Sequence, residues 1–182
     1  MRRAVIMMKR KGSEPLRRAM SDLLGEKLLE VWLPAQPTLP SNVASGEHAA
    51  ENSPAAQPVL VPVPYHWSHG FSSAAGTAEL LAEGIAAHTL WPVARRAVRR
   101  VRKTAKQGVL TWAERTANVR QAFALKSAQA IQGRQVLLVD DVFTSGATAA
   151  ELTRILLRGG AASVSVVVVA RATGVRESPG ME

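Results

Sequence analysis

The sequence predicts an α/β fold with a mostly parallel open sheet flanked by helices. Three consecutive stretches in the last third carry this prediction. Residues 135–139 form a mostly apolar run that suits a buried strand, residues 146–158 place leucine and isoleucine at helical spacing, and residues 163–170 are rich in β-branched valine. A strand, a helix and a second strand at this spacing form a right-handed parallel βαβ unit. Both strands are expected to be central in the sheet.

Earlier segments supply the remaining elements. Apolar periodicity predicts a helix within residues 1–33 and another over 74–88, while residues 58–63, ending in two prolines, predict the first core strand. Ala97 to Val101 is compatible with a further strand. Thr111 suits a helix N-cap, with Glu114 completing a capping box, so a helix is expected to run to about residue 120.

Three segments follow from this pattern. Residues 1–33 are expected to form an N-terminal helical segment, residues 34–57 a flexible or disordered loop, and residues 58–182 an α/β core. The middle segment contains four of the ten prolines and shows no hydrophobic period, so little burial is available to offset the entropy cost of ordering it. At 182 residues the whole chain has room for one such domain.

Composition restricts the function classes. The chain has no cysteine, which excludes a disulfide framework and a thiolate zinc site within it. No apolar run approaches the roughly 18 residues that a membrane span requires, and the N-terminus lacks a secretory pattern, so a cytoplasmic protein without membrane contact is expected. The net charge of +9 favours an anionic partner, either a polyphosphate ligand or nucleic acid.

A candidate site lies where the strand over residues 135–139 ends. Ligands of open parallel sheets bind outside the carboxyl ends of strands, and here Asp140 and Asp141 are followed by the turn Thr144-Ser145-Gly146-Ala147-Thr148. In extended backbone the two acids point in opposite directions, whereas a bend at the strand end lets both reach a ribose diol. Main-chain N–H groups, hydroxyls and the helix dipole at the turn are expected to hold a phosphate, although an ordinary βα junction with a capping hydroxyl gives a similar pattern.

The stretch VLLVDDVFTSGAT resembles the signature of type I phosphoribosyltransferases, which bind phosphoribosyl pyrophosphate. The segment RKTAKQGVLTWAERTANVRQAF is similar to the corresponding region of the ComF family of competence-associated phosphoribosyltransferase-like proteins. VPVPYHW and LLAEGIA resemble its first loop and the helix that follows, so the likeness covers most of residues 58–171. The chain departs from the family in reading His-Gly-Phe-Ser-Ser at 69–73 and in lacking the cysteines of an N-terminal zinc ribbon.

The resemblance implies a role for each part of the site. Asp140 and Asp141 would hold the ribose hydroxyls as catalytic residues and approach Mg²⁺ indirectly, through the ribose or water. The 144–148 turn would bind the 5′-phosphate, and residues 1–33 would contribute a hood. Lys103 is a further catalytic candidate, and the pyrophosphate region would comprise Pro64, Tyr65, His66, Arg102, Lys106 and Gln107.

Two functions stay open at this point. One is transfer of a phosphoribosyl group to or from an unidentified acceptor, with phosphoribosyl pyrophosphate or a nucleotide and Mg²⁺ bound. The other is a non-catalytic nucleotide-sensing or DNA-binding factor in DNA uptake, because seven cations occupy the twelve positions 95–106. A homodimer is a further open possibility. For Trp67, Trp91 and Trp112, core or interface packing is favoured over stacking on bases.

Overall fold

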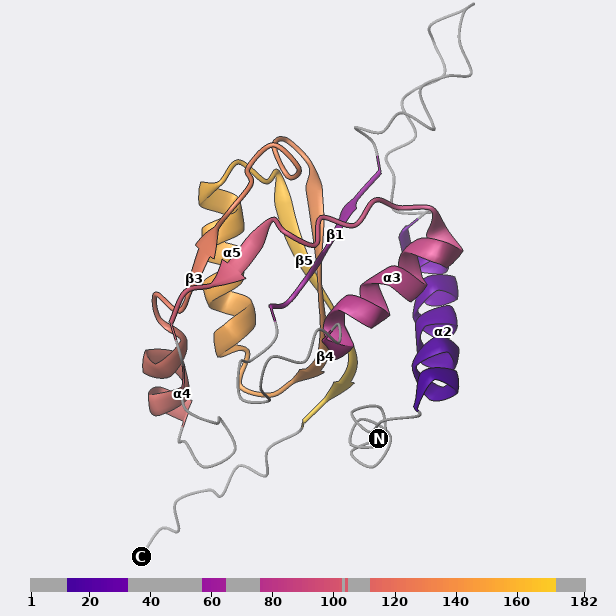
Figure 1. Ribbon diagram of the computed structural model, residues 1–182, viewed down its shortest axis with the longest axis horizontal. Coiled ribbons are helices and arrows are strands. Elements are labelled where there is room, and N and C mark those ends of the chain that lie inside the picture. The colour runs from indigo at the N-terminus through magenta and orange to yellow at the C-terminus, as the bar shows by residue number, and fades with distance from the viewer. Residues whose placement is uncertain (1–12, 33–56, 65–75, 103, 105–111, 173–182) are drawn as a thin grey trace, which may run out of the picture.

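The computed structural model describes residues 13–32, 57–64, 76–102, 104 and 112–172 (Figure 1). The elements within them are α2 (Glu14–Trp32), β1 (Val59–Pro62), α3 (Thr77–Thr89), β2 (Val98–Arg100), α4 (Trp112–Val119), β3 (Phe123–Leu125), β4 (Gln135–Phe143), α5 (Ala147–Arg158) and β5 (Ser163–Arg171). None of these helices is long and apolar enough to span a bilayer. The loop expected over residues 34–57 lies almost wholly outside the described residues.

A parallel sheet in the order β1-β4-β5 forms the centre of the fold. Val93 adds a parallel bridge to Leu60 on the other edge of β1. The predicted mostly parallel α/β architecture is thus confirmed. The expectation that the last strand is also central is wrong for the described residues, because β5 pairs only with β4 there and forms an edge. Its exposed Ser163, Ser165 and Val166 fit that position.

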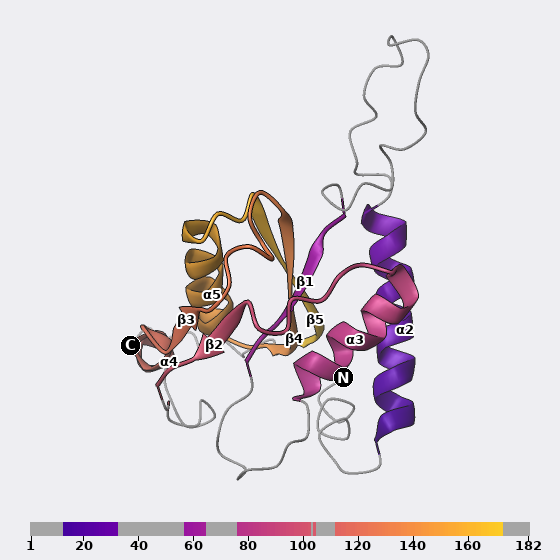
Figure 2. The same cartoon turned by 45° about the horizontal axis from the view of Figure 1, so that its top comes forward.

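The strands of the sheet divide their side chains between two apolar cores, as the pleat requires. Val136 and Leu138 of β4 pack in one core with Leu152 and Leu156 of α5. Leu137 of β4, by contrast, packs in the other core with helix α3. Both views place α5 on one side of the sheet and α3 with α2 on the other (Figures 1 and 2). Because helices cover both faces of the sheet, the buried part of β4 is a continuous apolar run in the sequence.

The predicted N-terminal helix is present as α2 and packs against α3. The close approach of α2 to α3 depends on small residues, because a Cβ on Gly84 of α3 would lie 2.3 Å from the Cβ of Ser21 on α2. Gly25 is similarly close to His88. Leu23 is half exposed, whereas Leu24 and Leu28 pack against the core. The role of this helix as a hood stays a prediction.

β2 and β3 form a separate two-stranded antiparallel sheet that packs beside α5; it is called the β2–β3 hairpin below, although α4 lies between its strands in the chain (Figure 2). The strand predicted within residues 97–101 is therefore present, whereas β3 was not predicted. The hairpin has two faces. Val98 and Phe123 point to the core and are buried, while Arg99 on the outer face is exposed.

Strand β4 is four residues longer than the predicted run over 135–139. Its pairing with β5 continues beyond the acids, through Val142 opposite Ala170 and Phe143 opposite Arg171. The length of β5 explains the difference, because its backbone offers hydrogen-bond partners as far as residue 171. A strand boundary placed where the apolar run ends therefore falls too early.

Glu151 of α5 connects the helix to the turn between α4 and β3. Its carboxylate accepts a 3.0 Å hydrogen bond from the backbone N–H of Gln121, a residue with φ 57°, and two bonds from Arg154. The bond from Arg154 is the main cause that lowers the pKa of Glu151 below its ordinary value of 4.5. An acid with a lowered folded pKa stabilises the fold above its unfolded pKa, and that stabilisation is lost as the pH falls through the folded pKa.

We expect Glu151→Gln to lower the melting temperature at pH 7 by about 2 °C, which corresponds to roughly 0.5–1 kcal/mol after solvent screening is allowed for. The difference from the unsubstituted protein should narrow as the pH falls through the lowered folded pKa of Glu151, where its carboxyl becomes neutral like the glutamine side chain. Thermal unfolding followed by circular dichroism between pH 3 and 7 measures it. Glu26→Gln on the exposed face of α2 is the control and should show little change. A difference that is constant with pH would contradict this account.

Candidate functional site

The carboxyl ends of β1, β4 and β5 meet at one edge of the sheet, at the lower side of Figure 1. β1 reaches this edge first, and the N–H of Val63 just beyond it donates to the carbonyl of Val139. β4 extends further, so its last residues and the turn into α5 project beyond β1. The structure therefore places residues 140–148 at the edge where parallel sheets bind ligands.

The two acids lie side by side on β4, each half-buried. The Asp140 carboxylate accepts a 2.8 Å hydrogen bond from the backbone N–H of Asp141. The ladder with β5 pairs Asp140 with Val168 and resumes at Val142 with Ala170. A side chain thus supplies a partner for the backbone of Asp141 within the ladder. Of the two acids, Asp140 lines the small cavity at this edge.

The turn before α5 depends on Gly146, which has φ 76° and ψ −2° at the N-cap of the helix. This left-handed conformation is costly for residues with a Cβ. A Cβ there would also lie 2.7 Å from Cζ of Phe143, so the ring packs directly under the turn. The hydroxyl of Ser145 accepts a long, 3.4 Å bond from the N–H of Ala147. The turn is therefore compact, with Thr144 exposed beside it.

The first turn of α5 suits an anion. N–H groups at the start of a helix lack intrahelical acceptors, and the helix dipole adds partial positive charge there. Unlike those of α2, α3 and α4, the first turn of α5 contains no acidic residue. The first turn of α5 thus contributes no carboxylate of its own that would compete for this position. The 144–148 turn therefore has features that suit an anion, and its role as the 5′-phosphate site stays a prediction.

A small cavity of about 40 Å³ lies under this edge. It is lined on one side by Asp140, Thr144 and Thr148, and on the other by apolar side chains that include Leu138 and Val166. This volume has room for water and not for a sugar phosphate. A ligand would accordingly lie across the open edge, with the acids and the turn beneath it.

The predicted pyrophosphate region is only partly within the described residues. Tyr65, His66, Lys103, Lys106 and Gln107 lie outside them. Pro64 is half-buried just beyond β1, on the same edge as the acids.

Arg102 is engaged elsewhere in the described structure. Its guanidinium donates 2.8 Å hydrogen bonds to the carbonyls of Asn118 and Arg120, where α4 ends. These bonds satisfy carbonyls that a helix end leaves without intrahelical donors. Its assignment to pyrophosphate stays a prediction.

Sequence reasoning overlooked Arg100, which it grouped with the other cations of residues 95–106. The structure places its guanidinium on the inner face of the hairpin, 4.5 Å from the ring centroid of Phe123. Burial is the main cause that lowers the pKa of Arg100, nearby Arg102 lowers it further, and Asp140 opposes both. The one sequence signal for a buried Arg100 was strand alternation, which places Arg99 and Arg100 on opposite faces of the predicted strand. The many neighbouring cations obscured this signal.

The acids also determine which metal the site can accept. No group of three or more acidic, histidine or cysteine side chains able to hold a metal ion occurs in the described part of the chain. Mg²⁺ commonly binds through one or two carboxylates, substrate phosphates and water. Asp140 and Asp141 fit that mode, in which most of the oxygen ligands come from the bound substrate. When bound there, Mg²⁺ would neutralise the charge of a pyrophosphate group.

A parallel sheet whose central strand leads through two carboxylates into a hydroxyl-rich helix N-terminus defines the phosphoribosyltransferase class of α/β proteins. Residues 57–179 match the family model described as the phosphoribosyl transferase domain. The chain belongs to that family.

Curated relatives refine the assignment. The chain is 39% identical over 106 residues to the DNA utilization protein YhgH of Escherichia coli K12, a match that covers 58% of this chain and 44% of the relative. It is 34% identical over 118 residues to competence protein F of Haemophilus influenzae, covering 62% and 50%. These relatives confirm the predicted membership of the ComF family. The matches span half or less of the length of either relative.

Solved structures of similar fold include the Trypanosoma cruzi hypoxanthine phosphoribosyl transferase, with 16% identity and a TM-score of 0.47 over 91% of this chain and 69% of that one. Another is the allosteric regulatory enzyme of purine biosynthesis, with 20% identity and a TM-score of 0.44 over 85% and 26%. The family assignment does not depend on these distant likenesses.

Gly146→Ala tests the turn. We expect it to destabilise the protein by about 2–4 kcal/mol, because alanine is strained at positive φ and its Cβ meets the Phe143 ring. Gly133→Ala is the matched control: its φ is also positive, at 66°, yet a Cβ there has nothing within 4 Å. It should cost only about 1 kcal/mol. Urea denaturation measures both variants, and equal losses would show that the contact with Phe143 does not constrain the turn.

Proposed function

We propose that this protein binds phosphoribosyl pyrophosphate together with Mg²⁺ and transfers the phosphoribosyl group to or from an acceptor that is still unidentified. One observation supports this proposal above the others. Half-buried Asp140 and Asp141 on β4 directly precede the Gly146 turn at the start of α5, on the sheet edge where ligands bind. Carboxylates suit ribose hydroxyls, and a helix N-terminus without acids suits a phosphate.

In this proposal the two parts of the site divide the ligand between them. The 144–148 turn holds the 5′-phosphate through main-chain N–H groups and hydroxyls. Asp140 and Asp141 accept hydrogen bonds from the ribose hydroxyls and orient the ring. Holding both ends fixes the anomeric carbon relative to the acceptor, which lowers the entropic part of the barrier.

The reaction is substitution at the anomeric carbon through an oxocarbenium-like state. The bond to the pyrophosphate oxygen breaks with its electron pair, and the acceptor's lone pair forms the new bond. The nearby carboxylates stabilise the positive charge that develops on the ribose. Cations around the site stabilise the pyrophosphate that leaves. Lys103 and Lys106 remain candidates for that task, and Gln107 remains a candidate for a neutral hydrogen bond to the pyrophosphate.

Isothermal titration calorimetry with phosphoribosyl pyrophosphate and Mg²⁺ tests the proposal. We expect binding by the unsubstituted chain and at least a tenfold loss in the Asp140→Asn/Asp141→Asn variant, because each acid is expected to make charge-assisted hydrogen bonds to the ribose. Asp22→Asn on α2 is the control and should bind normally. Absence of binding by the unsubstituted chain, or equal binding by the double variant, would rule the proposal out.

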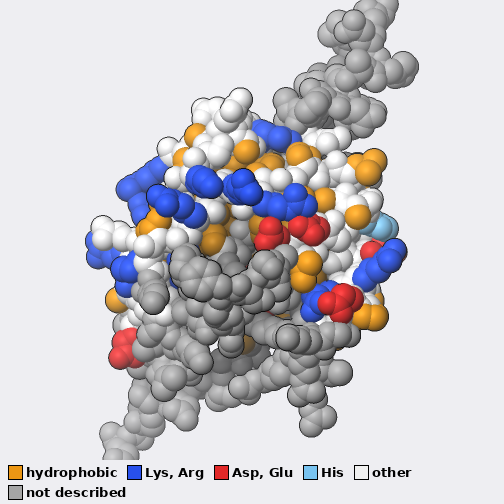
Figure 3. Space-filling model, viewed as in Figure 1, with side chains coloured by type: hydrophobic (Ala, Val, Ile, Leu, Met, Phe, Trp, Pro, Cys, Tyr) orange, Lys and Arg blue, Asp and Glu red, His pale blue; other side chains and the backbone are white. Residues whose placement is uncertain are grey.

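DNA binding is a second candidate function, favoured by a surface feature. Arg96, Arg99, Arg120 and Lys126, here called the basic band, are exposed on and beside the β2–β3 hairpin. Within the described residues these four side chains form no ion pair. Lys and Arg side chains run across this face of the molecule in Figure 3. The names of the relatives, DNA utilization protein and competence protein F, point in the same direction.

A gel shift with duplex DNA at 50 and 200 mM salt tests the basic band. We expect Arg96→Gln/Arg99→Gln to weaken binding at low salt and to reduce the salt dependence, because each lost phosphate contact lowers the slope by roughly one. Arg18→Gln/Lys27→Gln on α2 removes the same charge elsewhere and is the control. Equal shifts by the two variants would show that the basic band is not the DNA-binding surface.

A further inference from the structure

The inner face of the β2–β3 hairpin contains one charged residue among apolar ones. Val98, Phe123 and Leu125 on this face are buried or half-buried against the core that includes α5. Arg100, directly opposite Phe123 in the ladder, occupies the same face. An apolar residue is the ordinary choice at such a position, since burying a cation is costly unless it is paired. The placement of Arg100 therefore requires an explanation.

The known contacts of Arg100 use only part of its guanidinium. Its Nη1 donates a 2.8 Å hydrogen bond to Oγ1 of Thr104, a residue only 8% exposed. The guanidinium stacks over the Phe123 ring, which orients its plane. Its Nε is buried and has no hydrogen-bond partner within the described part of the chain. The group is thus held in place by two contacts, while its buried Nε donor stays unsatisfied within the described part of the chain.

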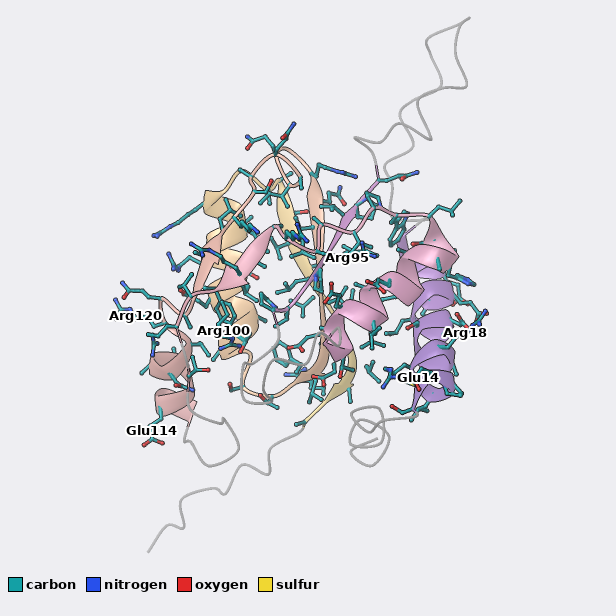
Figure 4. The ribbon with its side chains drawn as sticks, in the orientation of Figure 1. Glu14, Arg18, Arg95, Arg100, Glu114 and Arg120 are labelled. Carbon is teal, nitrogen blue, oxygen red and sulfur yellow. The ribbon has the colours of Figure 1, made fainter. Side chains whose placement is uncertain are left out.

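The electrostatic surroundings connect this cation to the candidate site. Asp140 attracts it and Arg102 repels it, and burial lowers the pKa of Arg100. In Figure 4 Arg100 lies at the end of β2 beside α5. A cation that is desolvated and has a second cation nearby is destabilised in the absence of an anion. The same two features increase the attraction that a bound anion would experience.

Arg134 provides a comparison. It is the other described arginine whose Nε is buried without a partner. Its Nη2, however, donates a 3.0 Å bond to the carbonyl of Gln57, just before β1, and it precedes β4 at the opposite edge of the sheet from the acids. Its contact fits a structural role for Arg134. Arg100 differs in lying beside α5, stacked on Phe123, with Asp140 among the charges that act on it.

We propose that Arg100 binds a phosphoryl group of the ligand at the site formed by Asp140 and the 144–148 turn. This inference rests on the proposed function and adds a residue to it. A guanidinium that is stacked and hydrogen-bonded loses little further freedom when it binds, and its planar donors suit phosphate oxygens. The 5′-phosphate and the pyrophosphate share this chemistry, and the experiment distinguishes them.

Calorimetry with two probes tests the inference: ribose 5-phosphate, and phosphoribosyl pyrophosphate with Mg²⁺. We expect Arg100→Met to weaken at least one of them by tenfold or more, because a charge-assisted hydrogen bond is lost. Loss for both probes assigns Arg100 to the 5′-phosphate, and loss for the pyrophosphate probe alone assigns it to the leaving group. Arg100→Lys should recover part of the affinity. Arg158→Met, at the exposed C-terminal end of α5, is the control and should bind normally.

A second measurement covers the case in which Arg100→Met folds poorly. In ¹⁵N spectra of the unsubstituted chain, the Nε–H signal of Arg100, identified by its absence in Arg100→Lys, should shift when either probe is added. An unchanged signal, or a folded Arg100→Met protein that binds both probes normally, overturns this inference alone. Failure of the unsubstituted chain to bind either probe would instead overturn the proposed function.

Discussion

The parallel pairing of β4 between β1 and β5 is the constraint on which the rest of the structure depends. It directs Leu138 into the core with α5 and Leu137 into the core with α3, so a shift by one residue would turn both apolar sets to the wrong sides. The same register fixes how far β4 projects past β1. Asp140 and Asp141 therefore reach the edge of the sheet because the apolar residues before them cannot move.

Carboxylates and phosphates repel one another, so a site that combines them must supply compensating positive charge. The start of α5 provides part of it, since its first turn contains no acid that would reduce the helix dipole. Arg100 provides a full charge from the hairpin, on the side of the sheet occupied by α5. In the proposed site, the start of α5 and the hairpin would thus both contribute positive charge near Asp140.

The sequence alone was sufficient to predict those elements of the fold that have a regular pattern of apolar residues. β4, α5 and the helix α2 follow from it because each buries a regular stripe or a continuous run. β3 was missed because three residues give no measurable alternation. The turn at Gly146 could be located from its residues, whereas the Phe143 ring beneath it could not, since that contact depends on how far β4 continues. Arg100 was missed because six other cations between 95 and 106 concealed which side of the strand it occupies.

The cations around the hairpin make several different kinds of contact and do not act as one basic surface. Arg95 pairs with Glu83 on α3, and Arg102 caps α4. Arg99 and Arg100 point to opposite faces of β2, one to solvent and one to the core. In the two proposals, nucleic acid would meet the exposed outer face and a phosphorylated sugar would meet the inner one. The two proposed functions therefore depend on different side chains of the same strand.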